Sequence, residues 1–308
     1  MIPLALITGF LGSGKTTFLR HLAQRYRGRQ IVFLVNEFSA KDVDGARLAR
    51  ETPDVVSVAG GSIFCQCLVA EFLARLRELP SRFGTPAAPV EAVVVEASGI
   101  ANPAVAGQML RESRLDRQYD LTDVVAMVDP GSFGKLLHTL PNIRAQVEGA
   151  SHILITKTDA YPAALIEQTE AAVRSINPAV TPVRVRYGAA NVELFGARLA
   201  GAQVGELALC RDPNFATFNL LLDQDLDLDR FRAMLETVKD DIYRIKGYTA
   251  AAGRRYYLDY STSGLRIEET AEQCPPELVF ILRAPVTAAA RRFLHDIRLG
   301  RLALPQPG

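Results

Sequence analysis

The sequence predicts an α/β domain, with a mostly parallel sheet and helices on both faces, followed by a smaller α+β domain. The chain has 308 residues, more than most single hydrophobic cores hold. Short apolar runs alternate with amphipathic patterns over residues 1–200, which is typical of a parallel sheet. That order changes beyond residue 214. We therefore expect domains at 1–200 and 215–308, joined by a glycine-bearing linker at 201–214.

In the first domain, short apolar runs that stop at turn-forming or polar residues are expected to be buried strands. They lie at 3–8, 30–35, 54–58, 91–95, 122–128, 152–155 and 180–185. Apolar residues at helical spacing predict helices at 16–26, 66–79 and 162–176. Because strands and helices alternate, the strands are expected to run parallel.

The second domain has another order of elements. A strand-like run at 215–222 precedes a helical pattern at 227–238. Further strand-like runs at 242–249, 254–260 and 278–282 come before a last helical pattern at 286–298. Consecutive strand-like runs without helices between them indicate an α+β domain.

Composition limits the class of partner. The formal net charge is +1, so there is no electrostatic reason to expect nucleic acid or an anionic membrane as partner. No apolar run approaches the roughly 18 residues that a spanning helix needs. Four cysteines in a chain of this length are not a disulfide framework, which favours a reducing cytoplasm.

A phosphate-binding motif follows the first predicted strand and opens the first predicted helix. Residues 9–16, GFLGSGKT, fit G-x-x-x-x-G-K-[ST]. Such glycines let backbone N–H groups surround a phosphate chain, and the helix N-terminus favours negative charge. Lys15 is expected to reach the β- and γ-phosphates and the Thr16 hydroxyl to bind Mg²⁺. The nucleotide-binding residues expected here are Gly12, Ser13, Gly14, Lys15, Thr16 and Thr17.

A second motif indicates the base. TKTD at 156–159 directly follows the predicted strand at 152–155, where GTPases usually carry N-K-x-D. The Asp159 carboxylate accepts from the N1–H and exocyclic amine of guanine, and the Lys157 stem lies over the base. Thr156 replaces the usual Asn and removes one supporting donor. The alternative is that TKTD is a plain surface loop. With the phosphate motif upstream, a guanine-binding loop is favoured, and the expected ligands are GTP and GDP.

Further motifs occur in order along the chain: VNEF (35–38), VVEASGIANP (94–103), MVDPGSF (127–133) and YRIKGY (243–248). Together with the two motifs above and a cysteine stretch, they resemble the CobW family, which is close to the HypB and UreG GTPases of metal-centre assembly. The resemblance covers nearly the whole chain. It implies a P-loop NTPase domain, a CobW-like C-terminal domain, a GTP-dependent homodimer and a metalloprotein client.

Two glutamates are candidate catalytic residues beside Lys15. The resemblance places Glu37 on the first switch segment and Glu96 near Mg²⁺. Both also follow predicted strands, where open α/β sheets place their ligands. One would orient the attacking water, or both would hold Mg²⁺ through water. The alternative is that each is a solvated charge at a strand end.

The cysteine stretch is GGSIFCQC, 60–67. The family signature is typically G-C-x-C-C, so Ser62 and Phe64 replace two cysteines, Cys65 is retained and Cys67 is additional. In an extended segment, residues two apart point to the same side. Thiolates bind soft metals such as Zn²⁺ or Co²⁺. Inert packing and a redox pair remain as alternatives.

Two thiolates are too few for a closed zinc site, which takes four ligands. The others would come from Glu37, Asp42 or Glu71, or from the same cysteines of a second copy.

The expected function is a Mg²⁺-dependent GTPase that acts as a metallochaperone. Its hydrolysis is expected to be slow when it is alone, because the sequence contains no evident arginine finger or Gln. The alternative is a nucleotide-driven conformational chaperone of a metal- or corrinoid-dependent enzyme that carries no metal itself.

Overall fold

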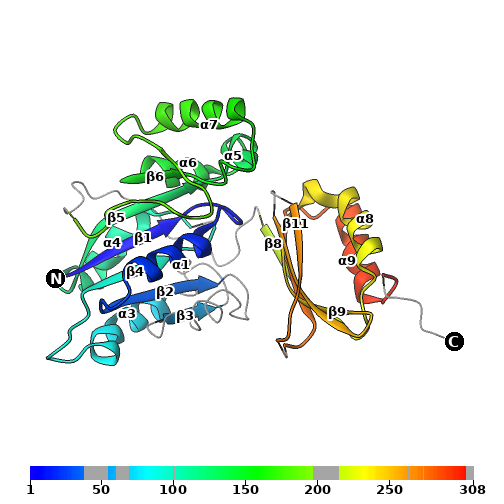
Figure 1. The fold of residues 1–308 in the computed structure, drawn as a ribbon, viewed down its shortest axis with the longest axis horizontal. Coiled ribbons are helices and arrows are strands. Elements are labelled where there is room, and N and C mark those ends of the chain that lie inside the picture. The colour runs from blue at the N-terminus through cyan, green and yellow to red at the C-terminus, as the bar shows by residue number, and fades with distance from the viewer. Residues whose placement is uncertain are drawn as a thin grey trace. The chain divides into compact units, whose positions relative to one another are not determined.

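The computed structural model describes residues 1–37, 55–59, 69–99, 101–196, 215–261, 264–272 and 274–302. The chain divides into two compact units, Met1–Cys210 and Arg211–Gly308, here called unit 1 and unit 2 (Figure 1). Each unit has its own sheet and its own hydrophobic core. Among the described helices, none is long and apolar enough to cross a membrane.

Unit 1 is built on a seven-stranded sheet in the order β3-β2-β4-β1-β5-β6-β7, in which every neighbouring pair is parallel. The strands are β1 (Ile2–Thr8), β2 (Ile31–Glu37), β3 (Val55–Ala59), β4 (Ala92–Glu96), β5 (Tyr119–Val128), β6 (His152–Ile155) and β7 (Val183–Arg184). All five residues of β4, AVVVE, are buried, because the strand is covered on both faces. The predicted parallel sheet is confirmed.

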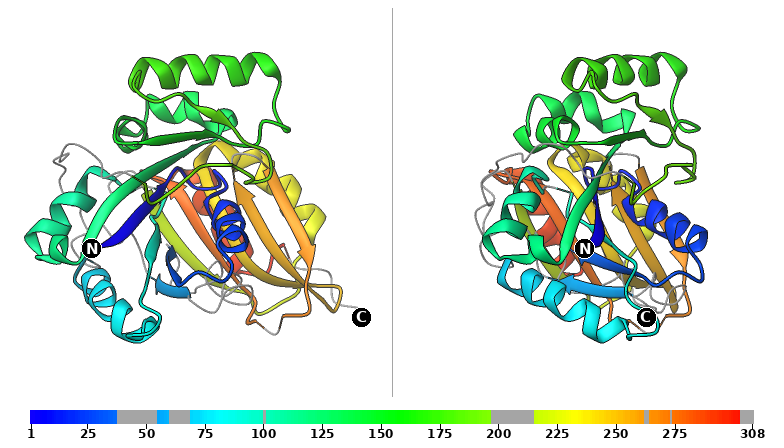
Figure 2. Two further views of the ribbon diagram at one scale, coloured as in Figure 1. Left: turned by 60° about the vertical axis from the view of Figure 1, so that its left-hand side comes forward. Right: turned by 90° about the vertical axis from the view of Figure 1, so that its left-hand side faces the viewer.

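Helices cover both faces of this sheet (Figure 2). The helices are α1 (Lys15–Arg25), α3 (Val69–Phe83), α4 (Ala104–Glu112), α5 (Pro130–Leu137), α6 (Pro141–Glu148) and α7 (Ala163–Ile176), with a 3₁₀ turn η1 at Leu115–Arg117. Leu4 and Leu6 of β1 pack in one cluster with α3 and α4. Ala5 and Ile7 pack in the other with α1. Alternate residues of one strand therefore serve opposite cores.

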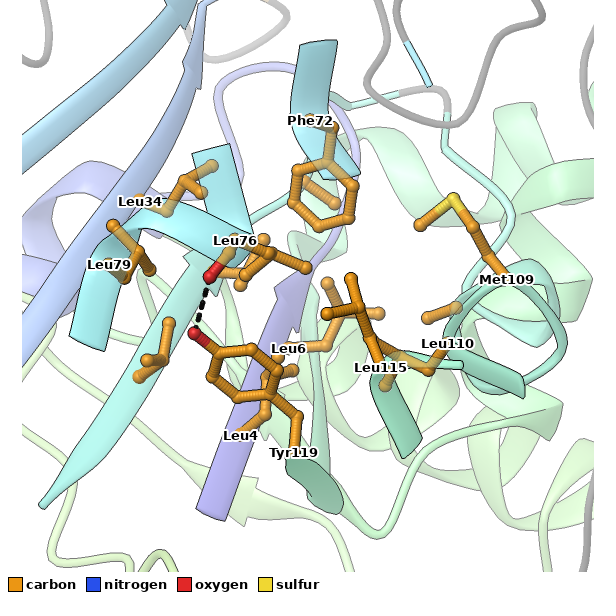
Figure 3. Close-up of a cluster of buried hydrophobic side chains, with 14 of the residues drawn as sticks. Leu4, Leu6, Leu34, Phe72, Leu76, Leu79, Met109, Leu110, Leu115 and Tyr119 are labelled. Atoms are coloured by element: carbon orange, nitrogen blue, oxygen red, sulfur yellow. Dashed lines mark hydrogen bonds between the residues drawn. The ribbon is translucent and has the colours of Figure 1, made fainter. Parts of the chain in front are cut away.

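Helix α3 continues past the residue where the helical pattern predicts its end. The pattern stops at residue 79, whereas α3 continues through Pro80 to Phe83. Proline has no N–H, so the carbonyl of Leu76, four residues earlier, loses its usual donor. The hydroxyl of Tyr119 donates to that carbonyl instead, at 2.6 Å (Figure 3). Burial raises the pKa of Tyr119, which keeps the hydroxyl protonated.

Short helices α4, α5 and α6 were not among the predicted ones. Each spans nine residues or fewer, too few for a clear helical period. Helix α5 nevertheless carries a local start signal. Asp129 precedes Pro130, and the Asp129 carboxylate accepts a hydrogen bond from the Gly131 N–H at 3.0 Å.

Unit 2 has a five-stranded antiparallel sheet in the order β11-β10-β9-β12-β8. Its elements are β8 (Phe215–Leu221), α8 (Leu228–Val238), a 3₁₀ turn η2 (Lys239–Asp241), β9 (Ile242–Ala251), β10 (Arg254–Ser261), β11 (Gly264–Glu269), β12 (Glu277–Arg283) and α9 (Ala288–Arg298). Phe231 of α8 and Phe293 of α9 share one core with Phe280 of β12. The predicted α+β arrangement is confirmed. The unpredicted β11 is an edge strand with three charged residues.

Candidate nucleotide site

The phosphate loop leads from β1 into α1 and needs glycine at defined points. Gly9 has φ 139°, and a Cβ there would lie 2.4 Å from the carbonyl oxygen of Met127 on β5. Gly14 has φ 96°, a left-handed conformation that glycine adopts without steric cost. Side chains at these positions would displace the loop from β5 or strain its backbone. The loop therefore keeps a tight path along the sheet edge.

Lys15 lies within this loop. Its ammonium donates to the carbonyl oxygens of Gly9 at 2.8 Å and Phe10 at 3.2 Å, and the residue is buried. No side-chain hydrogen bond caps the N-terminus of α1 in the described part of the chain. Among the described residues, the first N–H groups of α1 thus have no side-chain acceptor, and the Lys15 charge lies in the loop that precedes them. That combination suits a phosphate group.

Thr16 and Glu96 come together from different elements. The Thr16 hydroxyl lies 3.4 Å from a carboxylate oxygen of Glu96, the last residue of β4. Glu96 is only 5% exposed, deep for a charged side chain. A hydroxyl and a carboxylate beside a phosphate loop are hard oxygen ligands, so the residues present fit Mg²⁺. These two predicted site residues are adjacent although 80 positions separate them.

The ends of β2 and β4 are joined next to this pair. The Ser98 N–H donates to the side-chain oxygen of Asn36 at 3.1 Å, which ties the turn after β4 to the end of β2. Glu37 ends β2, with its backbone opposite Ala59 of β3. The Glu37 side chain lies outside the described residues.

Gly99 is a position that the sequence reasoning missed. A Cβ at Gly99 would lie 2.5 Å from the Leu11 backbone nitrogen, so the turn after Glu96 packs directly on the phosphate loop. The glycine in EASG is the sequence signal for this close approach. A side chain there would push the loop away from Glu96.

The TKTD loop follows β6 and contacts Asp129, a residue for which the sequence predicted no role. The ammonium of Lys157 lies 2.8 Å from a carboxylate oxygen of Asp129, whose other oxygen caps α5. Asp129 is buried, so this ion pair is shielded from solvent on one side. Thr156 is also buried, and its hydroxyl donates to the Val128 carbonyl at 3.2 Å. Asp159 is exposed at the outer end of the loop.

Tyr161 lies beside the same loop. A Cβ at Gly131 would lie within 3 Å of the Tyr161 ring, so the tyrosine packs against the first turn of α5. Burial first, and the negative charge of Asp129 second, raise the pKa of Tyr161. The phenol therefore stays neutral to higher pH than an exposed tyrosine would, and it lies beside Thr158 of the loop.

The predicted metal-binding cysteines, Cys65 and Cys67, lie outside the described residues, as does Asp42. Glu71 is described and lies exposed on α3, where its carboxylate pairs with Arg75 at 3.3 Å. Among the described residues, no group of three or more His, Cys, Asp and Glu side chains is placed to hold a metal ion.

Two families match the chain. Residues 3–184 match the family CobW/HypB/UreG, nucleotide-binding domain. Residues 215–298 match the cobalamin synthesis protein cobW C-terminal domain. The first match alone covers more than half of the chain.

Curated relatives match over different lengths. The zinc chaperone YjiA of Escherichia coli is 30% identical over 51% of this chain and 50% of its own length. A zinc chaperone CobW of a Sinorhizobium species is 25% identical over 87% of each chain. The zinc-regulated GTPase metalloprotein activator 1 of Schizosaccharomyces pombe is 25% identical over 61% of this chain and 46% of its own. For YjiA and the S. pombe protein, the match thus spans about half of the relative.

Solved structures resemble the chain at low identity. Zinc-bound YjiA GTPase from E. coli has 20% identity and a TM-score of 0.44, and the match covers 96% of this chain and 99% of that one. HypB from Helicobacter pylori, in complex with nickel, has 13% identity and a TM-score of 0.43, with 60% and 79% covered.

Proposed function

The chain belongs to the CobW/HypB/UreG family, and from that premise we propose that it is a Mg²⁺-dependent GTPase that acts as a metallochaperone. The observation that carries the proposal is the meeting of Lys15, Thr16 and Glu96 at the phosphate loop. An ammonium and a hydroxyl from the first two residues of α1 meet there with a carboxylate from the end of β4.

The chemistry assigned to this site is phosphoryl transfer to water. The glycine loop and Lys15 would bind the β- and γ-phosphates and neutralise their charge. Thr16 would hold Mg²⁺ directly and Glu96 through water; the ion supplies further neutralisation of the phosphate oxygens. Glu37 or Glu96 would orient the attacking water. Without a supplied arginine finger, hydrolysis by the isolated protein is expected to be slow.

Guanine selection is assigned to the TKTD loop. Asp159 would accept from guanine N1–H and the exocyclic amine, and the Lys157 stem would lie over the base. The exposed position of Asp159 and the ion pair that fixes Lys157 support this assignment. Adenine lacks that donor pair, so GTP should bind more tightly than ATP.

Titration calorimetry with GTP and ATP tests this assignment. Asp159→Ala should weaken GTP binding by about 10- to 100-fold, the effect of losing hydrogen bonds to a charged group, and leave ATP binding little changed. Asp116→Ala is the matched control, because Asp116 is an exposed acidic residue of η1, before the start of β5. Equal affinities of the wild type for GTP and ATP would show that the guanine assignment is wrong.

The metal role rests on the family and on the cysteine stretch. Relatives of this chain are named zinc chaperones and a zinc-regulated GTPase metalloprotein activator. We assign Zn²⁺ or Co²⁺ binding to Cys65 and Cys67, completed in the GTP state by ligands from a second copy. The client would be a metalloprotein. Free thiols of this kind fit a reducing cytoplasm.

Competition for zinc with a chromophoric chelator tests the metal role, with GDP and with a non-hydrolysable GTP analogue. The wild type should compete better with the analogue, and Cys65→Ser combined with Cys67→Ser should remove the difference. Affinity should fall as pH drops below the thiol pKa, because binding releases thiol protons. Cys274→Ser is the control, since Cys274 lies in unit 2 beside Glu272. Equally weak competition by wild type and double variant would leave the conformational chaperone as the function.

A further inference from the structure

A turn at residues 186–189, RYGA, lies beside the TKTD loop. The Val185 N–H donates to the Ile155 carbonyl at 2.8 Å, which joins the strand before the turn to β6. The N–H and the hydroxyl of Thr158 both donate to the Val185 carbonyl, at 3.3 and 3.2 Å. These bonds fix the turn next to the loop that carries Lys157 and Asp159.

The same turn packs on the helix that follows the phosphate loop. A Cβ at Gly188 would lie 2.9 Å from the Thr17 side chain and 3.1 Å from the Phe18 nitrogen. Gly188 also has φ 73°, so glycine suits this position both because the backbone is left-handed and because there is no room for a Cβ. The turn itself is closed by the Ala189 N–H, which donates to the Arg186 carbonyl at 2.9 Å. It is therefore held between α1 and the TKTD loop.

Tyr187 is the residue that this turn presents to solvent. It is 81% exposed, more than any other large hydrophobic side chain in the described residues. Its φ is 51°, in the left-handed region that a bulky residue rarely adopts. The neighbouring bonds hold it there at a cost in free energy. A strained, exposed aromatic next to two ligand-binding loops indicates a use for the ring.

We propose that Tyr187 stacks on the purine base and forms one face of the base site, with the Lys157 stem on the other. This rests on the proposed function, which places the phosphates at Lys15 and the base at Asp159. A nucleotide spanning those positions passes α1 near Thr17, where Gly188 anchors the turn. Stacking tolerates any base, because every base has a π-face. Tyr187 therefore sets the affinity for purine nucleotides, whereas Asp159 sets the preference for guanine.

Fluorescence tests the contact directly, because the chain contains no tryptophan. Tyr187→Trp introduces the only tryptophan, which can be excited apart from the tyrosines, and GDP should quench its emission if the ring stacks on the base. Tyr26→Trp is the control. Tyr26 follows the last residue of α1, roughly 16 Å along the helix from its start. GDP should leave its emission unchanged. Unquenched emission from Trp at 187 with GDP bound would overturn the proposal.

Affinity tests the division of roles. Tyr187→Ala should raise the Kd for GDP by about tenfold, as expected for loss of one base–aromatic stack. It should raise the Kd for inosine diphosphate, whose base lacks the exocyclic amine, by the same factor. Tyr187→Phe should bind like the wild type.

The outcomes separate this proposal from the function on which it rests. If Tyr187→Ala binds GDP like the wild type while Asp159→Ala loses its guanine preference, Tyr187 has no stacking role and the GTPase assignment stands. If Tyr187→Ala changes only the ratio of the Kd for GDP to the Kd for inosine diphosphate, the residue contacts the edge of the base and the stacking proposal is wrong. If the wild type does not bind GDP, the proposed function itself fails.

Discussion

Helix α1 of unit 1 and the two helices of unit 2 begin differently. In unit 2, the Asp227 side chain accepts from two N–H groups at the start of α8, and Thr287 accepts from the Ala290 N–H in α9. In unit 1, α1 follows Gly14 without a side-chain cap in the described residues. Capping satisfies helix donors within the protein, whereas the end of α1 can offer its donors to an anion. In the proposed function, the uncapped start of α1 therefore places the phosphate chemistry in unit 1.

The two sheets lead to the same conclusion. Parallel strands bring all their carboxyl ends to one edge of the sheet. Asn36 is the second-to-last residue of β2, Glu96 is the last of β4, and Thr156 directly follows β6. In the antiparallel sheet of unit 2, neighbouring strands end at opposite edges. A polar pair such as Arg244 and Asp259, 3.0 Å apart, joins two adjacent strands instead. This ion pair of unit 2 therefore links two strands within the sheet and does not lie at a strand end.

The largest expected effect tests whether unit 1 alone carries the activity. Lys15→Ala should lower GTP hydrolysis by about 10²–10³-fold, because the developing phosphate charge loses its main protein cation. Lys239→Ala removes a surface lysine of unit 2, paired with Glu236, and should leave the rate unchanged. Phosphate release at saturating GTP measures both. A Lys15→Ala variant near the wild-type rate would break the comparison.

The second effect concerns stability within unit 1. Tyr119→Phe should lower the free energy of unfolding of unit 1 by about 1–3 kcal/mol, because the Leu76 carbonyl is left buried without its donor. Tyr187→Phe removes an exposed hydroxyl from the same unit and should change little. Denaturant titration monitored by hydrogen exchange assigns the loss of stability to one unit. An unchanged midpoint for Tyr119→Phe would mean that the hydrogen bond contributes nothing net.

The third effect tests the caps of unit 2. Thr287→Ala should cost about 1 kcal/mol of stability, the usual effect of losing an N-cap, and leave nucleotide affinity intact. Thr237→Ala, at an exposed position near the end of α8, is the matched control. Thermal denaturation and GDP titration measure the two quantities. Weaker GDP binding by Thr287→Ala would mean that the units are not functionally separate.

The smallest effect appears at high pH. Burial raises the pKa of Tyr260 in unit 2 to about 12 from its usual 10. The neutral form is therefore favoured in the folded state, so the stability is fully present below pH 10 and is lost as pH rises towards 12. The loss at pH 10 should be only a few tenths of a kcal/mol. Tyr260→Phe should reduce the slope of stability against pH between pH 9 and 11 in denaturant titrations, although Tyr248, whose pKa burial also raises, keeps part of it. A slope equal to that of the wild type would contradict the prediction.

The sequence predicted the elements whose signals are local. Apolar runs located the strands, and GFLGSGKT located the phosphate loop, because each of these patterns lies within a few consecutive residues. The CobW family assignment and both fold classes are confirmed. The roles of Lys15, Glu96 and Asp159 stay predictions.

The missed features depend on partners far apart in the chain. Lys157 meets Asp129 across 28 positions, and Gly99 meets Leu11 only after the sheet has formed. The turn with Tyr187 takes its position from bonds to β6 and from packing on α1. No local pattern contains that information, so only the tertiary structure brings these residues together.

The hydroxyl of Tyr119 and the ring of Pro80 have an evolutionary consequence. Pro80 withholds the donor that the Leu76 carbonyl would otherwise receive, and Tyr119 supplies it from β5. The two positions are thus expected to covary among homologues. A lineage can lose the tyrosine hydroxyl cheaply only after proline has given way to a residue with an N–H. The order of substitutions therefore decides which mutational path is open, and Pro80→Ala should precede Tyr119→Phe in any path that keeps the fold stable throughout.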